Sequence, residues 1–249
     1  MPNSLIEIRG LSVGYGNIQV LRGIDLAIEF GERIGIFGPN GHGKTTLLET
    51  ISGLITPWEG EILLKGQRID SWSPRQILEA GVVHVCQGNT LFPRMTVLEN
   101  LYCGAYSRRV WKDRRRSIKQ VFQLFPRLAE RRGQKACTLS GGERQMLAIG
   151  AGIMAGGEVL MLDEPTLGLS PAVRGELSQA IQEAARGGIA IVLVEQDFDF
   201  LSEIVSRFCM VEEGRIVFEG KPEQISGNQV LEMYFGGAAG SPGGCRETD

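Results

Sequence analysis

The 249-residue sequence predicts an α/β fold built on a mostly parallel sheet. The first observation is that apolar runs typical of buried strands alternate with segments of helical periodicity. The second is a glycine-rich segment that matches the phosphate-binding loop, or P-loop, pattern between an apolar run and a helix. Its residues are Gly38, Pro39, Asn40, Gly41, His42, Gly43, Lys44 and Thr45, followed by Thr46.

The first 30 residues are expected to be β-structure. Apolar and polar residues alternate at 5–8 and again at 24–30, and a further short β-region follows at 61–66. Tyr15 lies between the first two segments, flanked by two glycines, which is an unusual place for an aromatic residue. These segments predict a β-subdomain that precedes and partly surrounds the phosphate-binding loop.

The phosphate-binding loop has residue types that suit a nucleoside triphosphate. Glycines let backbone N–H groups turn inward, and the following helix directs its positive end at an anion. Lys44 is expected to reach the β- and γ-phosphates, and the Thr45 hydroxyl to ligate Mg²⁺.

From about residue 88 to 155 the pattern becomes helical. One helix is expected to open at 97–101, and a single long helix is expected over 108–125. The long helix is strongly basic, and we favour a solvated helix face over a site for acidic lipid headgroups. Its basic residues are Arg108, Arg109, Lys112, Arg114, Arg115, Arg116 and Lys119.

The sheet pattern resumes after this insertion. Two continuous apolar runs, 159–162 and 189–194, predict strands that are covered on both faces. Between them, an apolar stripe predicts an amphipathic helix; its residues are Val173, Leu177, Ala180, Ile181 and Ala184. The expected units are therefore a core of 5–87 with 156–235, a helical subdomain of 88–155 and a disordered glycine-rich tail at 236–249.

Two acidic residues end the first of these strands. Asp163 is expected to hold Mg²⁺, and the adjacent Glu164 to orient or deprotonate an attacking water. Either residue alone is compatible with an ordinary strand end, whereas the pair together with the loop predicts hydrolysis of a nucleotide.

A second glycine-containing segment, Ser140-Gly141-Gly142-Glu143, precedes another helix. Ser140 can cap that helix, and the two glycines expose N–H groups at its positive end. One chain does not need two phosphate-binding segments for one nucleotide, and read alone this segment is only a loop with a helix cap.

Composition excludes several other classes of protein. A net charge of −3 argues against a general nucleic-acid binder, and no apolar run is long enough to predict a membrane-spanning helix. The first residues, Met1-Pro2-Asn3-Ser4, do not resemble a signal peptide. The five cysteines are scattered without metal-ligand spacing, as is usual in a reducing cytoplasm. Two histidines, His42 and His84, are too few for a histidine-based metal site.

Taken together, the motifs resemble those of the ATP-binding subunits of ABC transporters over about residues 5–235. More narrowly, the chain is similar to the ATPase subunits of bacterial importers for branched-chain amino acids, urea and short amides. The segments that carry the resemblance are 38–46, 91–101, 139–145, 163–171 and 194–197. The resemblance implies a P-loop nucleotide-binding domain of the ABC type, with an N-terminal antiparallel β-subdomain and a helical insertion.

The resemblance assigns further roles. Tyr15 matches the aromatic residue that stacks on adenine, and Gln87 matches the glutamine that touches Mg²⁺ and links the ATP site to the membrane partner. Ser140, Gly141, Gly142 and Glu143 would contact the nucleotide of the facing subunit. Residues 88–100 would line the groove that accepts a short helix of the membrane partner.

Two positions depart from the wider ABC pattern. Gln196 occupies the place of the usual switch histidine, and its amide can bond a γ-phosphate but cannot become cationic. Ser170 replaces an aspartate, which weakens an inter-subunit ion pair. Both departures are ordinary for the branched-chain importer group.

The function implied is ATP hydrolysis with Mg²⁺, coupled to solute import at the cytoplasmic face of the bacterial inner membrane. The implied partners are a second ATP-binding subunit (a different chain favoured over an identical one), two transmembrane permease subunits and, indirectly, an extracytoplasmic solute-binding protein; nucleic acid is not among them. The alternatives are a soluble ABC ATPase of translation or DNA repair, an ATP-sensing module without turnover, and an exporter subunit.

Overall fold

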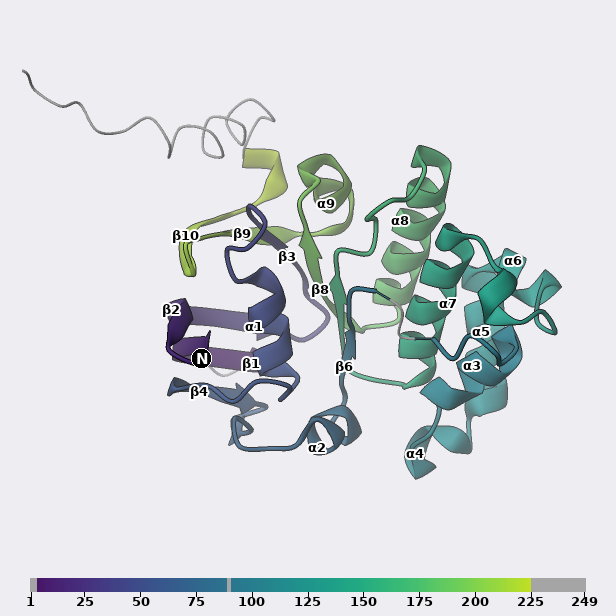
Figure 1. Ribbon diagram of the computed structural model, residues 1–249, viewed down its shortest axis with the longest axis horizontal. Coiled ribbons are helices and arrows are strands. Elements are labelled where there is room, and N and C mark those ends of the chain that lie inside the picture. Colours follow the sequence, from purple (N-terminus) through teal and green to yellow (C-terminus); the bar gives the residue numbers. More distant parts are fainter. Residues whose placement is uncertain (1–3, 89–90, 225–249) are drawn as a thin grey trace, which may run out of the picture.

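The computed structural model describes residues 4–88 and 91–224, which form two sheets and a group of helices (Figure 1). The first sheet is antiparallel, with strand order β2-β1-β4-β5, and the second has six strands in the order β10-β9-β3-β8-β7-β6. The tail predicted at 236–249 lies outside the described residues.

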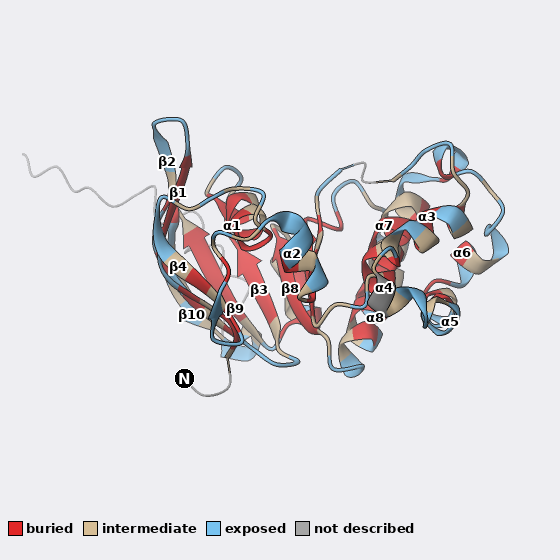
Figure 2. Cartoon of the chain, turned by 90° about the horizontal axis from the view of Figure 1, so that it is seen from below, coloured by how far each residue is buried: buried red, intermediate tan, exposed pale blue. Residues whose placement is uncertain are grey.

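The six-stranded sheet is parallel except at one edge. Parallel pairing joins β9, β3, β8, β7 and β6, and β10 runs antiparallel to β9. The strands are β3 (Arg33–Phe37), β6 (Val82–Val85), β7 (Val159–Asp163), β8 (Ala190–Glu195), β9 (Arg207–Glu212) and β10 (Arg215–Gly220). Every residue of β7 and β8 is buried, because both faces of the sheet are covered (Figure 2). The predicted parallel α/β core is confirmed.

Alternate residues of the central strands enter two different cores. Val159 and Met161 of β7 pack with α1 (Lys44–Ile51) and the antiparallel sheet, whereas Leu160 and Leu162 pack with the helices on the opposite face. The same alternation divides β8. This parity decides to which face each residue at a strand end is directed.

The antiparallel sheet covers the α1 side of the molecule. Its long hairpin is β1 (Ser4–Tyr15) and β2 (Ile18–Glu29); β4 (Glu59–Leu64) pairs with β1, and β5 (Gln67–Arg68) pairs with β4. Leu47, Leu48 and Ile51 of α1 are fully buried in the core that joins the two sheets. Helix α1 is therefore held from both sides at its start, where the phosphate-binding loop ends.

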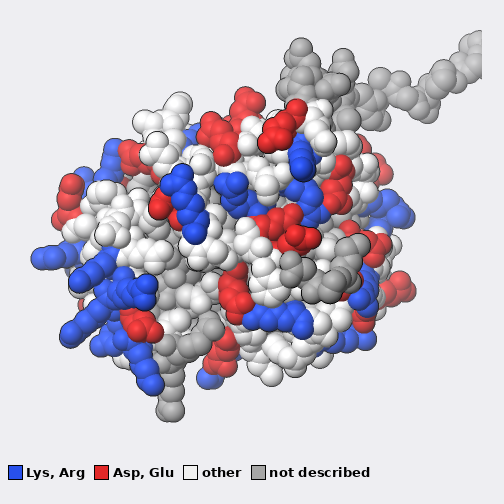
Figure 3. Space-filling model, turned by 180° about the vertical axis from the view of Figure 1, so that it is seen from behind, with Lys and Arg blue, Asp and Glu red and all other residues white. Residues whose placement is uncertain are grey.

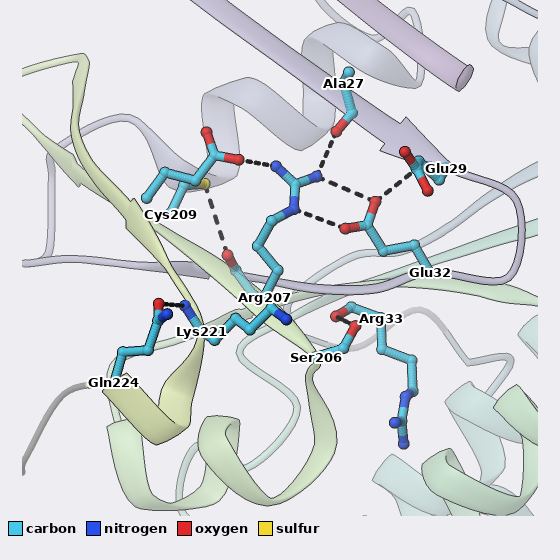
Figure 4. A network of polar contacts seen from close by, with 11 residues as sticks. Ala27, Glu29, Glu32, Arg33, Ser206, Arg207, Cys209, Lys221 and Gln224 are labelled. Carbon is cyan, nitrogen blue, oxygen red and sulfur yellow. Dashed lines mark hydrogen bonds and ion pairs between the residues drawn. The ribbon is translucent and has the colours of Figure 1, made fainter. Parts of the chain in front are cut away.

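Arg207 on β9 ties the antiparallel sheet to the parallel sheet (Figure 4). Its guanidinium donates to the Ala27 carbonyl of β2 at 2.6 Å and to both oxygens of Glu32, and it also pairs with Glu219 of β10. Although burial opposes it, hydrogen bonding to Glu32 and Glu219 raises the pKa of Arg207. The Arg207 guanidinium therefore fixes the end of β2 relative to β9.

The remaining helices cover the other face of the parallel sheet and extend away from it (Figure 1). They are α3 (Val97–Gly104), α4 (Arg108–Trp111), α5 (Arg114–Leu124), α6 (Pro126–Glu130), α7 (Gly141–Met154), α8 (Pro171–Arg186) and α9 (Phe198–Ile204), while α2 (Pro74–Glu79) precedes β6. The stripe predicted on α8 is confirmed, since Leu177, Ala180, Ile181 and Ala184 are buried against this face.

The single helix predicted over 108–125 is wrong, because α4 ends before α5 begins. The break lets the Trp111 ring pack edge-on against Tyr102 at 6.1 Å. Arg114 then lies over the other side of that ring and donates to the Trp111 carbonyl at 2.6 Å. Lysine and arginine side chains gather on the surface over α5 (Figure 3).

Candidate functional site

The site lies where β3, β8 and β7 end side by side. These strands are neighbours in the sheet, so their carboxyl ends bring together the loop 38–43, residues 196–197 and the loop 164–170. Ligands of parallel α/β sheets bind at this edge.

The phosphate-binding loop lies in close contact with the neighbouring strands β9 and β2. Gly38 has φ +153° and a Cβ at this position would lie 2.2 Å from the Val211 carbonyl oxygen, while Gly43 has φ +101° and a Cβ there would meet Leu21 at 2.6 Å. Only glycine fits both places without displacing neighbours. His42 does not face the ligand cleft described below; its Nδ1 accepts a hydrogen bond from the Glu213 backbone N–H at 3.1 Å.

Lys44 begins α1 and folds back over the loop. Its Nζ donates to the carbonyl oxygens of Gly38 at 2.8 Å and Pro39 at 2.9 Å and lies 3.8 Å from Glu164. Only 4% of the residue is exposed, and burial lowers its pKa although three nearby carboxylates oppose the shift. The ammonium is therefore placed to exchange carbonyl partners for phosphate oxygens.

Asp163 ends β7 on the α1 face of the sheet, as the parity of the strand requires. The Thr45 hydroxyl donates to its Oδ1 at 3.2 Å, and its other oxygen, Oδ2, is buried without a hydrogen-bond partner among the described residues. Burial raises the pKa of Asp163 to about 6. An orphaned buried carboxylate oxygen beside a hydroxyl is a donor set that suits Mg²⁺, so the residues present fit this ion.

Glu164 follows in a left-handed backbone conformation, with φ +44°. This conformation is uncommon for residues other than glycine and turns the chain out of the strand. Both carboxylate oxygens are engaged: the Gln196 amide donates to Oε1 at 2.6 Å and the Gln87 amide donates to Oε2 at 3.0 Å. The structure thus brings together the predicted residues Lys44, Gln87, Asp163, Glu164 and Gln196.

A cleft of about 490 Å³ opens in front of these groups. Tyr15 lies at one side, with its ring half exposed and its hydroxyl bonded to Glu49 Oε2 at 2.9 Å. Ten predicted site residues line this cleft, namely Tyr15, Asn40, Gly41, Gly43, Lys44, Thr45, Thr46, Gln87, Glu164 and Gln196. A planar base can lie against the free face of Tyr15 while phosphates reach the loop.

The segment Ser140–Glu143 lies at the start of α7, outside that cleft. Ser140 accepts a hydrogen bond from the Glu143 N–H and donates its own N–H to the Glu143 carboxylate at 2.9 Å. Glu143 is buried and also pairs with Arg131 at 2.7 Å, so its carboxylate serves the cap. The predicted cap is confirmed, and Ser140 and Gly141 remain exposed on the surface.

An apolar groove of about 360 Å³ lies beyond Gln87. Leu91, Phe92 and Asn100, from the segment predicted to line a partner groove, lie along it. Asn100 holds the segment in place, since it accepts from the Phe92 N–H at 2.8 Å and donates to the Thr96 carbonyl at 2.9 Å. Phe92 is more than half exposed.

Three residues near the site were missed by sequence reasoning. Val20 lines the cleft beside Tyr15, Glu49 holds the Tyr15 hydroxyl, and Glu195 is a buried carboxylate directly before Gln196. The pairing of β1 with β2 is what brings Val20 near Tyr15, and no sequence pattern signals it. Glu195 could have been noticed as the only charged residue at the end of an otherwise apolar run.

The sequence is similar to those of known proteins. Residues 21–167 match the family model described as ABC transporter. The branched-chain amino acid transport ATP-binding protein BraG of Pseudomonas aeruginosa is 36% identical over 234 residues, covering 94% of this chain and all of that protein. The probable counterpart LivF of Archaeoglobus fulgidus is 35% identical, over 89% and 94% of the two chains, and the glutamine transport protein GlnQ of Escherichia coli is 33% identical, over 90% and 94%.

Solved structures agree in fold. An ATP-binding cassette in its ADP conformation superposes with a TM-score of 0.81 at 23% identity, covering 96% of this chain and 99% of that one. A dimeric cassette bound to ADP and Pi in a post-hydrolysis state gives 0.73 at 25% identity, covering 87% and 98%. In the described part of the chain, no helix combines the length and apolar character needed to cross a bilayer. The chain belongs to the ABC transporter family, as one of its ATP-binding, ATP-hydrolysing proteins.

Proposed function

We propose that this protein is the ATPase of an ABC importer that takes up branched-chain amino acids or related small solutes such as urea and short amides. The observation that carries this proposal is the likeness to BraG, which extends over the whole of that protein at 36% identity. GlnQ, at a similar level of identity, is a glutamine transport protein, so solute is the part of the proposal that needs direct measurement.

The residues around the cleft have distinct roles in this proposal. The loop 38–43, Lys44, Thr45 and Thr46 bind the phosphates, and the Tyr15 ring stacks on adenine. Thr45, Asp163 and Gln87 are the residues that would hold Mg²⁺, which neutralises phosphate charge when bound.

Glu164 is the catalytic carboxylate. It orients or deprotonates the attacking water, and the Gln196 amide donates to the γ-phosphate. The Gln196 and Gln87 amides each bond one oxygen of Glu164, and each oxygen keeps a second lone pair that can accept from water.

The partners follow from surfaces that the single chain leaves open. Ser140, Gly141, Gly142 and Glu143 at the start of α7 would contact the nucleotide of a second cassette, which we propose is a different ATPase subunit. The groove lined by Leu91 and Phe92 would receive a helix of a permease subunit. The protein would then lie at the cytoplasmic face of the inner membrane, where two permease subunits receive solute from an extracytoplasmic binding protein.

The two parts of the fold would have separate tasks. In this proposal residues 5–87 and 156–235 make up the ATP-binding core with its β-subdomain, and 88–155 make up the helical subdomain; of these, 89–90 and 225–235 lie outside the described residues. The helical subdomain then carries both the segment that faces the second cassette and part of the groove that faces the membrane.

The decisive experiment is co-purification of the tagged protein from detergent-solubilised native membranes. The proposal expects two multi-spanning proteins and a related ATPase in the eluate. Ribosomes, DNA-repair proteins or no membrane protein would overturn the transport function and favour a soluble ABC ATPase. Uptake of labelled leucine, urea and glutamine in a strain that lacks the gene would then identify the solute, and loss of efflux instead of uptake would indicate an exporter.

A further inference from the structure

The end of β8 carries a buried carboxylate that neither hydrolysis nor nucleotide binding has used so far. Glu195 is 3% exposed and lies directly before Gln196. Its Oε1 accepts from the Thr166 N–H at 3.0 Å and from the Thr166 hydroxyl at 2.7 Å, and its Oε2 accepts from the Gln196 N–H at 3.3 Å. Thr166 is also buried, and it lies two residues after Glu164 in the loop that follows β7.

These contacts close a ring. Starting from Glu164, the chain runs through Pro165 to Thr166, hydrogen bonds lead to Glu195, the chain continues to Gln196, and the Gln196 amide returns to Glu164 Oε1 at 2.6 Å. The two chain segments are already joined below the ring, since Asp163 pairs with Val194 and the Glu164 N–H donates to the Val194 carbonyl at 3.0 Å.

We infer that Glu195 is a positioning residue for ATP hydrolysis: by binding Thr166, it holds the loop that carries Glu164 at a set distance from the Gln196 amide. The two reacting side chains themselves project from loops, where small shifts of the backbone move them easily. A shift of about 1 Å between groups that act on one water can lower the rate up to 100-fold.

The chemistry of the ring requires a carboxylate. Three donors converge on Glu195, and an ionised carboxylate is acceptor-only, so it satisfies all of them. A glutamine here would have to turn its NH₂ group toward either a backbone N–H of Thr166 or that of Gln196. Either orientation places two donors face to face in a buried place, which is unfavourable.

A second link restrains the same segment from its other side. Asp197, directly after Gln196, pairs with Arg174 of α8 and also accepts from the Phe200 N–H at 3.1 Å, capping α9. Gln196 is therefore flanked by two acidic residues that are both anchored to the region following β7. Glu195 is the buried member of the pair and the one bonded to the loop of Glu164.

The test compares Glu195→Gln, Gln196→Ala and the double variant in steady-state ATPase assays of the full chain, with nucleotide affinity measured by a fluorescent ATP analogue. We expect kcat to fall roughly 10- to 100-fold in Glu195→Gln, because Glu164 and the Gln196 amide lose their alignment. Affinity for the analogue should stay within twofold of wild type. In the double variant, kcat should be no lower than in Gln196→Ala alone, because Glu195 acts through Gln196.

Two milder variants keep the proposal testable if Glu195→Gln does not fold. Thr166→Val removes only the 2.7 Å hydroxyl bond and should lower kcat, whereas Thr166→Ser retains the hydroxyl and should restore it. The matched control is Glu203→Gln, which makes the same substitution at a carboxylate outside the ring, one that accepts from the Ser178 hydroxyl of α8 at 3.0 Å. Unchanged kcat in both Glu195→Gln and Thr166→Val, losses that multiply in the double variant, or an equal loss in Glu203→Gln would overturn the inference.

Discussion

The edge of the parallel sheet and the start of α7 both present groups suited to phosphate, but they are stabilised in different ways. At the sheet edge, four ionisable side chains are buried close together and the carboxylates outnumber the single ammonium: Lys44, Asp163, Glu164 and Glu195. At the start of α7, Ser140 and Glu143 satisfy each other's hydrogen bonds and Arg131 balances the charge.

The two regions differ in how far their charged groups depend on a ligand. Burial shifts the pKa of Lys44 down and that of Asp163 up, so the protein surroundings at the sheet edge disfavour the charged forms of both groups. Hydrogen bonds from Ser140 and the charge of Arg131, working against burial, lower the pKa of Glu143. The start of α7 therefore satisfies its own charges, whereas at the sheet edge a cation beside Asp163 would favour the ionised carboxylate.

The largest effect is expected at Glu164. Glu164→Gln keeps the shape of the side chain and removes its ability to accept a proton, so turnover should fall at least about 100-fold. ATP affinity should be retained, because the loop and Lys44 are untouched. Single-turnover phosphate release, measured beside equilibrium binding of the ATP analogue, separates the two quantities.

The control for that variant is Glu158→Gln, which changes a carboxylate that pairs with Lys65 at the other end of β7. It should leave turnover unchanged. Retained turnover in Glu164→Gln would show that another residue is the catalytic base.

Asp163→Asn should separate stability from activity. In the nucleotide-free protein the carboxyl has a pKa of about 6, above its usual value, so the native state binds more protons than the unfolded state between about pH 4 and 6. Its stability therefore falls as the pH rises through this window. The variant lacks this loss and should gain roughly 1–3 kcal/mol relative to wild type on going from pH 4 to 7.

Urea unfolding at pH 4 and pH 7 without nucleotide measures this gain, and turnover as a function of Mg²⁺ concentration measures the loss of function. In wild type, protons and Mg²⁺ should compete for Asp163, so that raising Mg²⁺ moves the acidic limb of the rate profile to lower pH. A stability change that is equal at both pH values would show that Asp163 is ionised without penalty and that the sheet edge is not strained.

Tyr15 tests the apolar side of the same cleft. Tyr15→Ala removes the ring and should weaken ATP binding roughly tenfold, within the usual range for loss of an aromatic stack on a base. Tyr15→Phe loses the 2.9 Å bond to Glu49 and the 3.4 Å contact with the Thr46 hydroxyl but keeps the ring, and should bind ATP nearly as wild type does. The dependence of ATP binding on Mg²⁺ should be the same in wild type and in both variants. If Tyr15→Ala binds ATP as well as Tyr15→Phe does, the ring does not stack on adenine.

Much of the sheet edge could be predicted because its strands are local apolar runs and its loop is a local motif. Glu195 could not be assigned, because its contact with Thr166 depends on the pairing of β7 with β8 and on the left-handed turn at Glu164. Val20 depends likewise on the pairing of β1 with β2. The break between α4 and α5 was missed because the packing of Trp111 on Tyr102, a tertiary contact, overrides a continuous helical pattern.

The smallest effect is expected at Ser140, and it is the most informative about the start of α7. Ser140→Ala removes a helix cap and should lower the free energy of unfolding by about 1 kcal/mol. Helix α2 offers a matched control, since Ser73 makes the same reciprocal cap with Gln76 and its hydroxyl accepts at 3.4 Å, against 3.3 Å for Ser140. Ser73→Ala should lose a similar amount of stability.

Turnover then distinguishes a cap from a ligand contact. If Ser140 binds the nucleotide of a facing cassette, Ser140→Ala should lower kcat/KM at protein concentrations where cassettes associate, whereas Ser73→Ala should not. Equal kcat/KM in the two variants would mean that Ser140 only caps α7, and that this surface serves the fold alone. The start of α7 would then have a structural role alone, and the surface that binds the nucleotide of the facing cassette would lie elsewhere.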